Sequence, residues 1–236
     1  MDAELVDLLC PGGFYKFCNP QVAKGAPTPG QVVGAHSAYP PKDPWIVKVH
    51  AYDAADPLRS RYEVKKFEDS DCPHPPVKEL QLRADENMYV YTGKERPLVV
   101  VGAVSSRWAN SHHVEETFLC APAFTFKRRH PEEFIERCIG FDFPSLFYLP
   151  ADRNGCSQPS AVRFEFMQPI ARKALHNWAS GSPRRPIALS DQAYALFVNH
   201  LSRFLFGQGL DVGVCATIDT YRQMVLEAIG GQGRKA

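Results

Sequence analysis

The stretch that decides the fold is Arg96-Pro97-Leu98-Val99-Val100-Val101-Gly102-Ala103-Val104, the most apolar run in a chain of 236 residues. From Leu98 onward it has the length of a buried β-strand. A membrane helix needs about 18–20 apolar residues in a row, and no stretch of the sequence comes near that length. We therefore predict a central strand over 98–104 and no membrane span.

The sequence before this strand is rich in proline and in short β-type runs. Many of the 20 prolines fall in the first third of the chain, where each one removes an amide donor and obstructs a helix. The runs between them alternate apolar and polar residues, which predicts half-buried antiparallel strands. These predicted strands span residues 31–35, 45–51, 61–67 and 88–91. Residues 69–76 predict an exposed loop.

Further strands are predicted after the central one. They span 117–126, 145–149 and 161–167, with a turn at 152–155 before the last of them. Pro122 predicts an irregular or edge strand, because proline cannot donate to a ladder. A short helix is predicted over 130–138, which begins with proline and two carboxylates.

The C-terminal part of the sequence predicts two helices. Ser190 is a candidate N-cap and Gly207 a candidate stop for a helix over 191–206. Its apolar side chains share one face at helical spacing, and we expect that face to pack on the strands. This face consists of Tyr194, Phe197, Val198, Leu201, Phe204 and Leu205. A second, shorter helix is predicted over 217–229, followed by a frayed tail. The chain is therefore predicted to be α+β.

Composition restricts the classes of function. Lys and Arg number 27 and Asp and Glu 26, so any polyanion site must be a local patch rather than bulk charge. The seven cysteines include no C-x-x-C pair, which predicts reduced thiols. The acidic N-terminus lacks the features of a signal peptide, which predicts a cytoplasmic protein. Adjacent His112 and His113 would point to opposite faces of a strand, and we predict no metal and no other cofactor.

Four segments, in this order, resemble the MazF/PemK-like toxin family. Pro29-Gly30-Gln31-Val32-Val33 is similar to the family's opening P-G-D-V-V strand, and Arg96-Pro97-Leu98-Val99-Val100-Val101 to its R-P-x-L-V-(I/V) strand. Residues 160–175 resemble the S-x-V-x-x-E-Q-I-R-T-I-D strand and its extension, with Glu165 in register. The predicted helix at 190–206 takes the position of the family's closing helix.

The resemblance implies an SH3-like antiparallel β-barrel with a packed C-terminal helix. The barrel is expected over 29–207, with an insertion at 42–85 and the closing helix at 190–206. Residues 1–28 are expected to form an N-terminal extension, and residues 208–236 a C-terminal extension with a short helix. Family members are two-fold dimers, which implies a homodimer here unless the insertion covers the dimer face.

The activity implied by the resemblance is cleavage of single-stranded RNA without a metal ion, restrained by an antitoxin. The RNA 2′-hydroxyl is the nucleophile, and an arginine stabilises charge on the scissile phosphate, because a guanidinium donates two parallel hydrogen bonds and stays protonated. Arg96 corresponds to this arginine. Thr125 is the candidate for a hydroxyl near the cleaved bond, with Ser105 and Ser106 as alternatives.

Basic and aromatic residues around these positions predict an RNA groove, because cations pair with phosphates and bases stack on rings. The predicted RNA-binding residues are Lys94, Arg107, Trp108, Lys127, Arg128, Arg129 and Gln168. Gln168 stands where the family has an arginine, so it supplies hydrogen bonds without charge. This departure leaves an alternative: a catalytically inactive MazF-like subunit that binds a protein partner in a regulatory or defence assembly, of toxin–antitoxin or phage-defence type.

Overall fold

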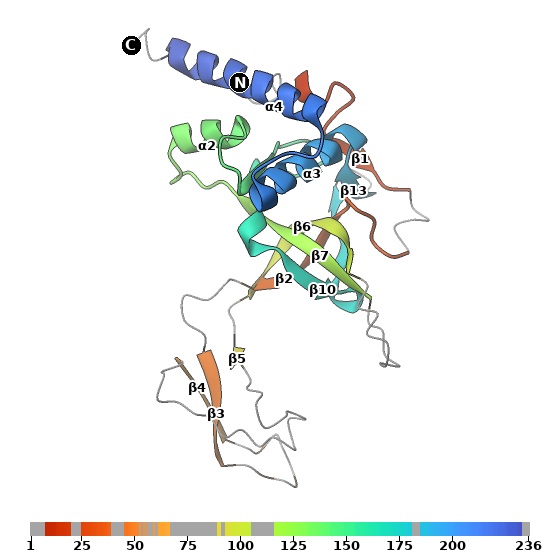
Figure 1. Cartoon of the computed structure of the whole chain (residues 1–236). Coiled ribbons are helices and arrows are strands. Elements are labelled where there is room, and N and C mark those ends of the chain that lie inside the picture. The colour runs from red at the N-terminus through yellow and green to blue at the C-terminus, as the bar shows by residue number, and fades with distance from the viewer. Residues whose placement is uncertain are drawn as a thin grey trace. The chain divides into compact units, whose positions relative to one another are not determined.

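Figure 1 shows a computed structural model of the chain, which describes residues 8–19, 25–38, 45–51, 53, 55, 59, 61–66, 89–90, 93–104, 116–180 and 185–232. The chain divides into two compact units, one of residues 38–94 and one of residues 1–37 with 95–236. The described part is an α+β structure with antiparallel sheets and three α-helices. The predicted insertion 42–85 falls within the smaller unit.

The smaller unit holds a three-stranded antiparallel sheet in the order β4-β3-β5. Strand β3 spans Trp45–Ala51, β4 spans Arg61–Lys66 and β5 spans Tyr89–Val90, which confirms the three strands predicted there. The side chain of Ile46 in β3 is buried. The predicted loop 69–76 lies outside the described residues.

The larger unit is organised around a seven-stranded sheet in the order β11-β2-β6-β7-β9-β8, with β10 also paired to β7. Strand β6, Gly93–Val104, contains the predicted central strand. The other strands are β2 (Val32–Ala38), β7 (Thr117–Thr125), β8 (Leu146–Leu149), β9 (Ser160–Arg163), β10 (Gln168–Ala171) and β11 (His176–Asn177). A second sheet contains β1 (Tyr15–Phe17), β13 (Arg185–Leu189) and β12 (Ala179–Ser180).

Strand β7 is an interior strand, so of the two alternatives predicted from Pro122, an irregular or an edge strand, the edge strand is wrong. Leu98 of β6 lies opposite Pro122 on one side. On the other side, β10 pairs with residues 117–120 and β9 with residues 123–125. Pro122 therefore falls where the partner strand changes, and a residue without an amide donor is tolerated at that gap in the ladder.

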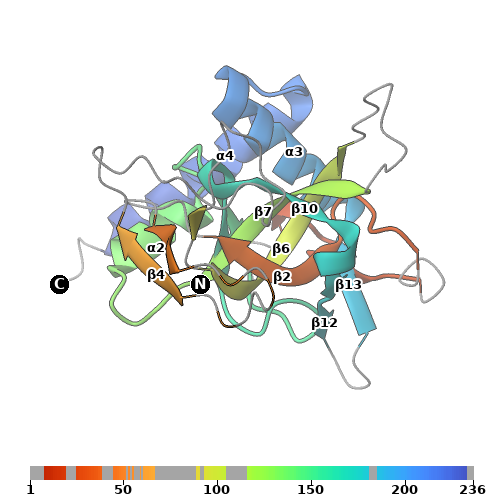
Figure 2. The same ribbon diagram turned by 90° about the horizontal axis from the view of Figure 1, so that it is seen from below.

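Two 3-10 turns interrupt the last strands of the main sheet. The predicted strand 161–167 ends early, because the turn η3 (Phe164–Phe166) follows Arg163. The turn η4 (Arg172–Ala174) connects β10 to β11, which pairs with β2. The pairings among the described strands do not close the sheet into a barrel. Figure 2 shows the neighbouring strands β2, β6, β7 and β10 from below.

Each face of the main sheet carries its own apolar cluster. Val99, Ala121 and Val162 belong to the cluster that also contains Phe197 of helix α3 (Asp191–Phe206), and we call this side the helix face. The cluster on the other side, which we call the second face, consists of Val33, Ala35, Leu98, Val100, Phe118, Cys120 and Ile170. Successive residues of β6 thus belong to different clusters, as the two-residue period of a strand requires.

Helix α3 has the predicted bounds and caps. Ser190 Oγ accepts a hydrogen bond from Ala193 N at 3.2 Å, and Gly207 ends the helix in the left-handed conformation with φ 73°. The buried stripe of the helix is narrower than predicted. Leu205, which we expected to pack on the strands, is 51% exposed, whereas the polar His200 is buried.

The other two helices pack against each other, and the C-terminal one also packs against α3. Helix α2 spans Glu132–Ile139, and helix α4 spans Val212–Gln232, which is longer at both ends than the predicted 217–229. The earlier start of α4 has a local cause, since Asp211 Oδ1 accepts a hydrogen bond from Val214 N at 3.0 Å. The later end replaces the predicted frayed tail with helix as far as Gln232.

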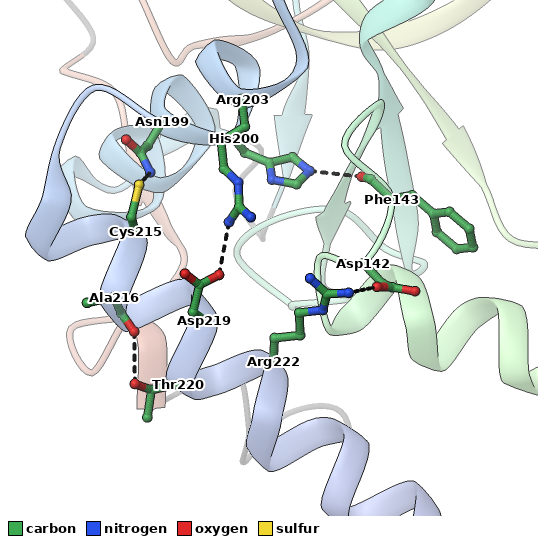
Figure 3. Close-up of polar contacts among 10 residues, drawn as sticks. All are labelled: Asp142, Phe143, Asn199, His200, Arg203, Cys215, Ala216, Asp219, Thr220 and Arg222. Carbon is green, nitrogen blue, oxygen red and sulfur yellow. Dashed lines mark hydrogen bonds and ion pairs between the residues drawn. The ribbon is translucent and has the colours of Figure 1, made fainter. Parts of the chain in front are cut away.

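Asp142 joins the region of α2 to α4 (Figure 3). Its carboxylate is 13% exposed and pairs with Arg137 at 2.7 Å and also with Arg222 of α4. Replacing Asp142 with asparagine removes the negative charge between two guanidinium groups. We expect the free energy of unfolding to fall by about 2 kcal/mol and Tm by about 4–8 °C, measured by calorimetry.

The matched control for this prediction is Asp219→Asn. Asp219 pairs with Arg203 at 3.2 Å, but its side chain is 58% exposed. Because exposed ion pairs contribute little, the control should lose less than about 1 kcal/mol. Equal losses in the two variants would show that Asp142 does not hold α4 in the way described.

Candidate nucleic-acid interface

Arg96 lies on the second face of the sheet, in line with Leu98 and Val100. Leu98 is opposite Pro122 in the antiparallel register, so Arg96, two residues earlier, is level with Phe124 on β7. The guanidinium carbon of Arg96 lies 4.1 Å from the centroid of the Phe124 ring. The central strand therefore carries a cation held over an aromatic ring.

A second arginine, which the sequence analysis did not select, reaches the same ring. The guanidinium carbon of Arg163, at the end of β9, lies 5.4 Å from the Phe124 centroid and 4.1 Å from the Phe166 centroid. The two rings meet edge to face at 5.6 Å. We call Arg96, Phe124, Arg163 and Phe166 the arginine–phenylalanine stack. The apolar Val162 was the signal in the sequence that could have indicated Arg163. Val162 is buried on the helix face, so the next residue of the strand, Arg163, lies on the opposite face.

The two arginines differ in their electrostatic surroundings. Partial burial lowers the pKa of Arg96, which nevertheless stays protonated at neutral pH. Arg163 donates from Nε at 2.9 Å and from a terminal nitrogen at 2.6 Å to one carboxylate oxygen of Glu165. Two cations and one carboxylate leave this region net positive, which suits a phosphate group.

Gln168 borders the stack. It lies opposite Cys120 in the β10–β7 register, and its side-chain amide donates to Ser37 Oγ at 2.9 Å. A longer contact, 3.4 Å, joins the same amide nitrogen to the carbonyl oxygen of Phe166. Ser37 is buried, so this hydrogen bond connects β10 to β2 at the edge of the second-face cluster.

Thr125 projects from the other face of the sheet. It lies opposite Ser160, one pair beyond Phe124 and Ala161, and accepts a hydrogen bond from Ser160 Oγ at 3.4 Å. Because side chains alternate along a strand, Phe124 carries the stack on the second face and Thr125 points to the helix face. The structure does not bring Arg96 and Thr125 into one site, contrary to their expected grouping.

The remaining predicted RNA-binding residues are distributed along the chain. Lys127, Arg128 and Arg129 form an exposed turn after β7, which His130 holds by accepting from Lys127 N at 2.8 Å and donating to Lys127 O at 2.9 Å. Lys94 is exposed and belongs to the smaller unit. Outside the described residues lie Arg107, Trp108, Ser105 and Ser106.

The described part of the chain does not offer a metal site. No three His, Cys, Asp or Glu side chains gather there as metal binding requires. The six cysteines in this part are free thiols. Its helices lack the length or the apolar character needed to cross a bilayer. Of the described groups, the arginine–phenylalanine stack is therefore the best candidate for a functional site.

Comparisons of the chain with models of known protein families, with curated proteins and with solved structures give no match.

Proposed function

We propose that the chain is a MazF/PemK-like endoribonuclease that cleaves single-stranded RNA without a metal ion. The observation that carries the proposal is the arginine–phenylalanine stack, in which Arg96 shares the Phe124 ring with Arg163. Cations beside aromatic rings are the groups that proteins use on the phosphates and bases of single-stranded RNA. A cytoplasmic location, an antitoxin partner and a homodimer belong to the same proposal.

The strand order supports an SH3-like barrel as the fold behind this activity. Strands β11-β2-β6-β7 are successive neighbours, and β10 pairs with β7 on its far side. The second-face cluster draws its residues from β2, β6, β7 and β10. Strands that surround one small apolar cluster are the basis of a small barrel, whose interior is filled by side chains.

In the proposed reaction, the RNA 2′-hydroxyl loses its proton and attacks the adjacent phosphorus. The bond from phosphorus to the 5′-oxygen of the next nucleotide breaks, and that oxygen takes up a proton, which leaves a 2′,3′-cyclic phosphate and a 5′-hydroxyl. Arg96 stabilises the charge that grows on the phosphate oxygens, because its guanidinium is positioned before the reaction. Arg163 supplies the second cation that Gln168 does not provide.

The test is to incubate the purified chain with a mixed pool of single-stranded RNA, with and without EDTA. We expect fragments that end in a cyclic phosphate and form at the same rate with EDTA present. Cleavage that needs a divalent ion, or fragments with 5′-phosphate ends, would contradict the proposed reaction.

A catalytically inactive MazF-like subunit is the second candidate. Two observations favour it: Thr125 lies on the opposite face from Arg96, and the amide of Gln168 already donates to Ser37. The family resemblance assigns the Thr125 hydroxyl and the Gln168 amide to the RNA site. In the structure the first faces away from Arg96 and the second is engaged by Ser37. No cleavage by the intact wild-type chain, at any RNA concentration tested, would favour this candidate and a protein partner.

Single substitutions of Arg163 and Thr125 separate the two faces of the sheet. We expect Arg163→Ala to slow cleavage at least about 10-fold, because it removes a charge-assisted contact to phosphate. Thr125→Ala should change the rate by less than about 3-fold, since its hydroxyl faces away from the stack. Cleavage rates on one RNA substrate measure both effects. A larger loss in Thr125→Ala would assign the reaction to the helix face.

A further inference from the structure

Exposed apolar side chains occur at the corner between α3 and α4. Phe206 and Leu210 are each 70% exposed, and Val212 is 86% exposed. Leu205, one residue before Phe206, is also exposed. Exposed apolar side chains gathered in one place are typical of an interaction surface rather than of a free helix end.

A groove of about 390 Å³ lies beside these residues, between the outer edge of α3 and the beginning of α4. Tyr194 and Val198 line it from α3, and Leu210 and Val214 line it from the other side. Tyr194 and Val198 belong to the apolar stripe of α3 that the chain buries only in part. The groove therefore continues the unburied half of an apolar helix face.

The groove is built on a connection with defined geometry. Asn199 accepts a hydrogen bond from Asp211 N at 3.0 Å. It also donates to Cys215 Sγ at 3.3 Å (Figure 3). Gly209 packs so closely that an added Cβ would lie 2.3 Å from Cys215 Sγ. Because the connection is already ordered, binding in this groove would cost little conformational entropy.

The charged groups at the groove are acidic in balance. Asp191 and Asp211 line it, and Lys16 pairs with Asp191, which leaves one carboxylate in excess. Two copies of the chain that met here about a two-fold axis would bring like charges together, which disfavours a second copy as occupant.

We propose that this groove docks an amphipathic helix of a partner protein, with leucine-like anchors in the groove and Lys or Arg facing Asp211, the carboxylate that Lys16 leaves unneutralised. Grooves between helices take such helices through apolar residues at spacings of three, four and seven. The proposal is independent of RNA cleavage, because α3 lies on the helix face and the arginine–phenylalanine stack lies on the second face.

The probe is a synthetic peptide of about 15 residues with leucines at that spacing and lysines elsewhere, titrated into the isotope-labelled full chain by NMR. We expect shifts at the amides of Val198, Leu210 and Val214 and a Kd below about 1 mM. Leu210→Asp should weaken binding at least about 10-fold, because it puts a charge in the apolar lining that the leucine anchors would contact. Met224→Asp is the matched control on α4, since Met224 is exposed outside this groove.

Three results would overturn the proposal. The first is equal affinity for a peptide in which glutamates replace the lysines. The second is binding that Leu210→Asp leaves unchanged while Tm shows the variant folded. The third is a dimer, seen by light scattering, that Leu210→Asp dissociates, which would assign the groove to a second copy. None of these results bears on RNA cleavage.

Discussion

Replacing Arg96 with alanine is expected to slow RNA cleavage by at least about 100-fold, the scale lost with one preorganised charge-stabilising donor. The guanidinium lies 4.1 Å from the Phe124 centroid, so its position is set before substrate arrives. Arg96→Lys keeps the charge but not the planar, delocalised group, and we expect a loss of about 10-fold. Single-turnover rates on a defined RNA measure both variants.

Arg185→Ala is the matched control for this prediction. Arg185 also stacks on a phenylalanine, with 3.7 Å between its guanidinium carbon and the Phe17 centroid, but it lies on β13 in the other sheet. We expect Arg185→Ala to cleave RNA at the wild-type rate. Arg185→Ala and Arg96→Ala should each lose about 1 kcal/mol in the free energy of unfolding, because each loses a cation–π contact. Wild-type cleavage by Arg96→Ala would reject the site.

Lowering the pH from about 6.5 to about 4 is expected to remove about 3 kcal/mol of stability through His200 alone. His200 Nε2 lies 3.0 Å from the carbonyl oxygen of Phe143 (Figure 3) and 3.0 Å from that of Leu146. This nitrogen therefore carries a proton and donates it. Among the described residues, Nδ1 has no hydrogen-bond partner. Protonating it would place an unsatisfied charged donor in the core.

The direction of the pH effect follows from the two protonation equilibria. Burial lowers the pKa of His200 to about 4 in the folded chain, whereas an unfolded chain has the ordinary value of about 6.5. Between these values the unfolded state binds a proton that the folded state does not. The contribution of neutral His200 to the free energy of unfolding is therefore complete above pH 6.5 and is lost as the pH falls toward 4.

Denaturant unfolding of the wild type and of His200→Gln across this pH range measures the effect. We expect the free energy of unfolding to fall more steeply with decreasing pH in the wild type than in His200→Gln. His176→Gln is the control, since His176 is half exposed on β11 and leaves His200 unchanged. If His200→Gln does not fold, the NMR titration of the His200 ring in the wild type gives its pKa directly. A midpoint near 6.5 would contradict the prediction.

The elements that depend on neighbouring residues could be predicted from the sequence. Ser190 and Gly207 set the ends of α3, because a cap acts on amides and carbonyls within one helical turn. The run from Leu98 to Val104 predicts a strand because its apolar residues are consecutive. Arg96 is a candidate on different grounds, because residues 96–101 resemble the R-P-x-L-V-(I/V) strand of the MazF/PemK-like family.

The site itself depends on pairing between distant segments. Arg163 meets Phe124 and Arg96 only because β6, β7 and β9 are neighbours in one sheet. The same register puts Thr125 on the helix face and leaves Pro122 at a gap in the ladder.

Tertiary structure decides which side chains share a face of the sheet, because side chains along a strand alternate between the two faces. A shift of one residue in the pairing would exchange the two faces of the sheet, and with them the residues that can meet. Packing of both apolar clusters selects the register, and that packing involves residues far apart in the chain. The sequence by itself therefore determined strands β2 to β9 and helix α3, whereas strands β1 and β10 to β13 were not predicted. The tertiary structure decided which side chains share a site.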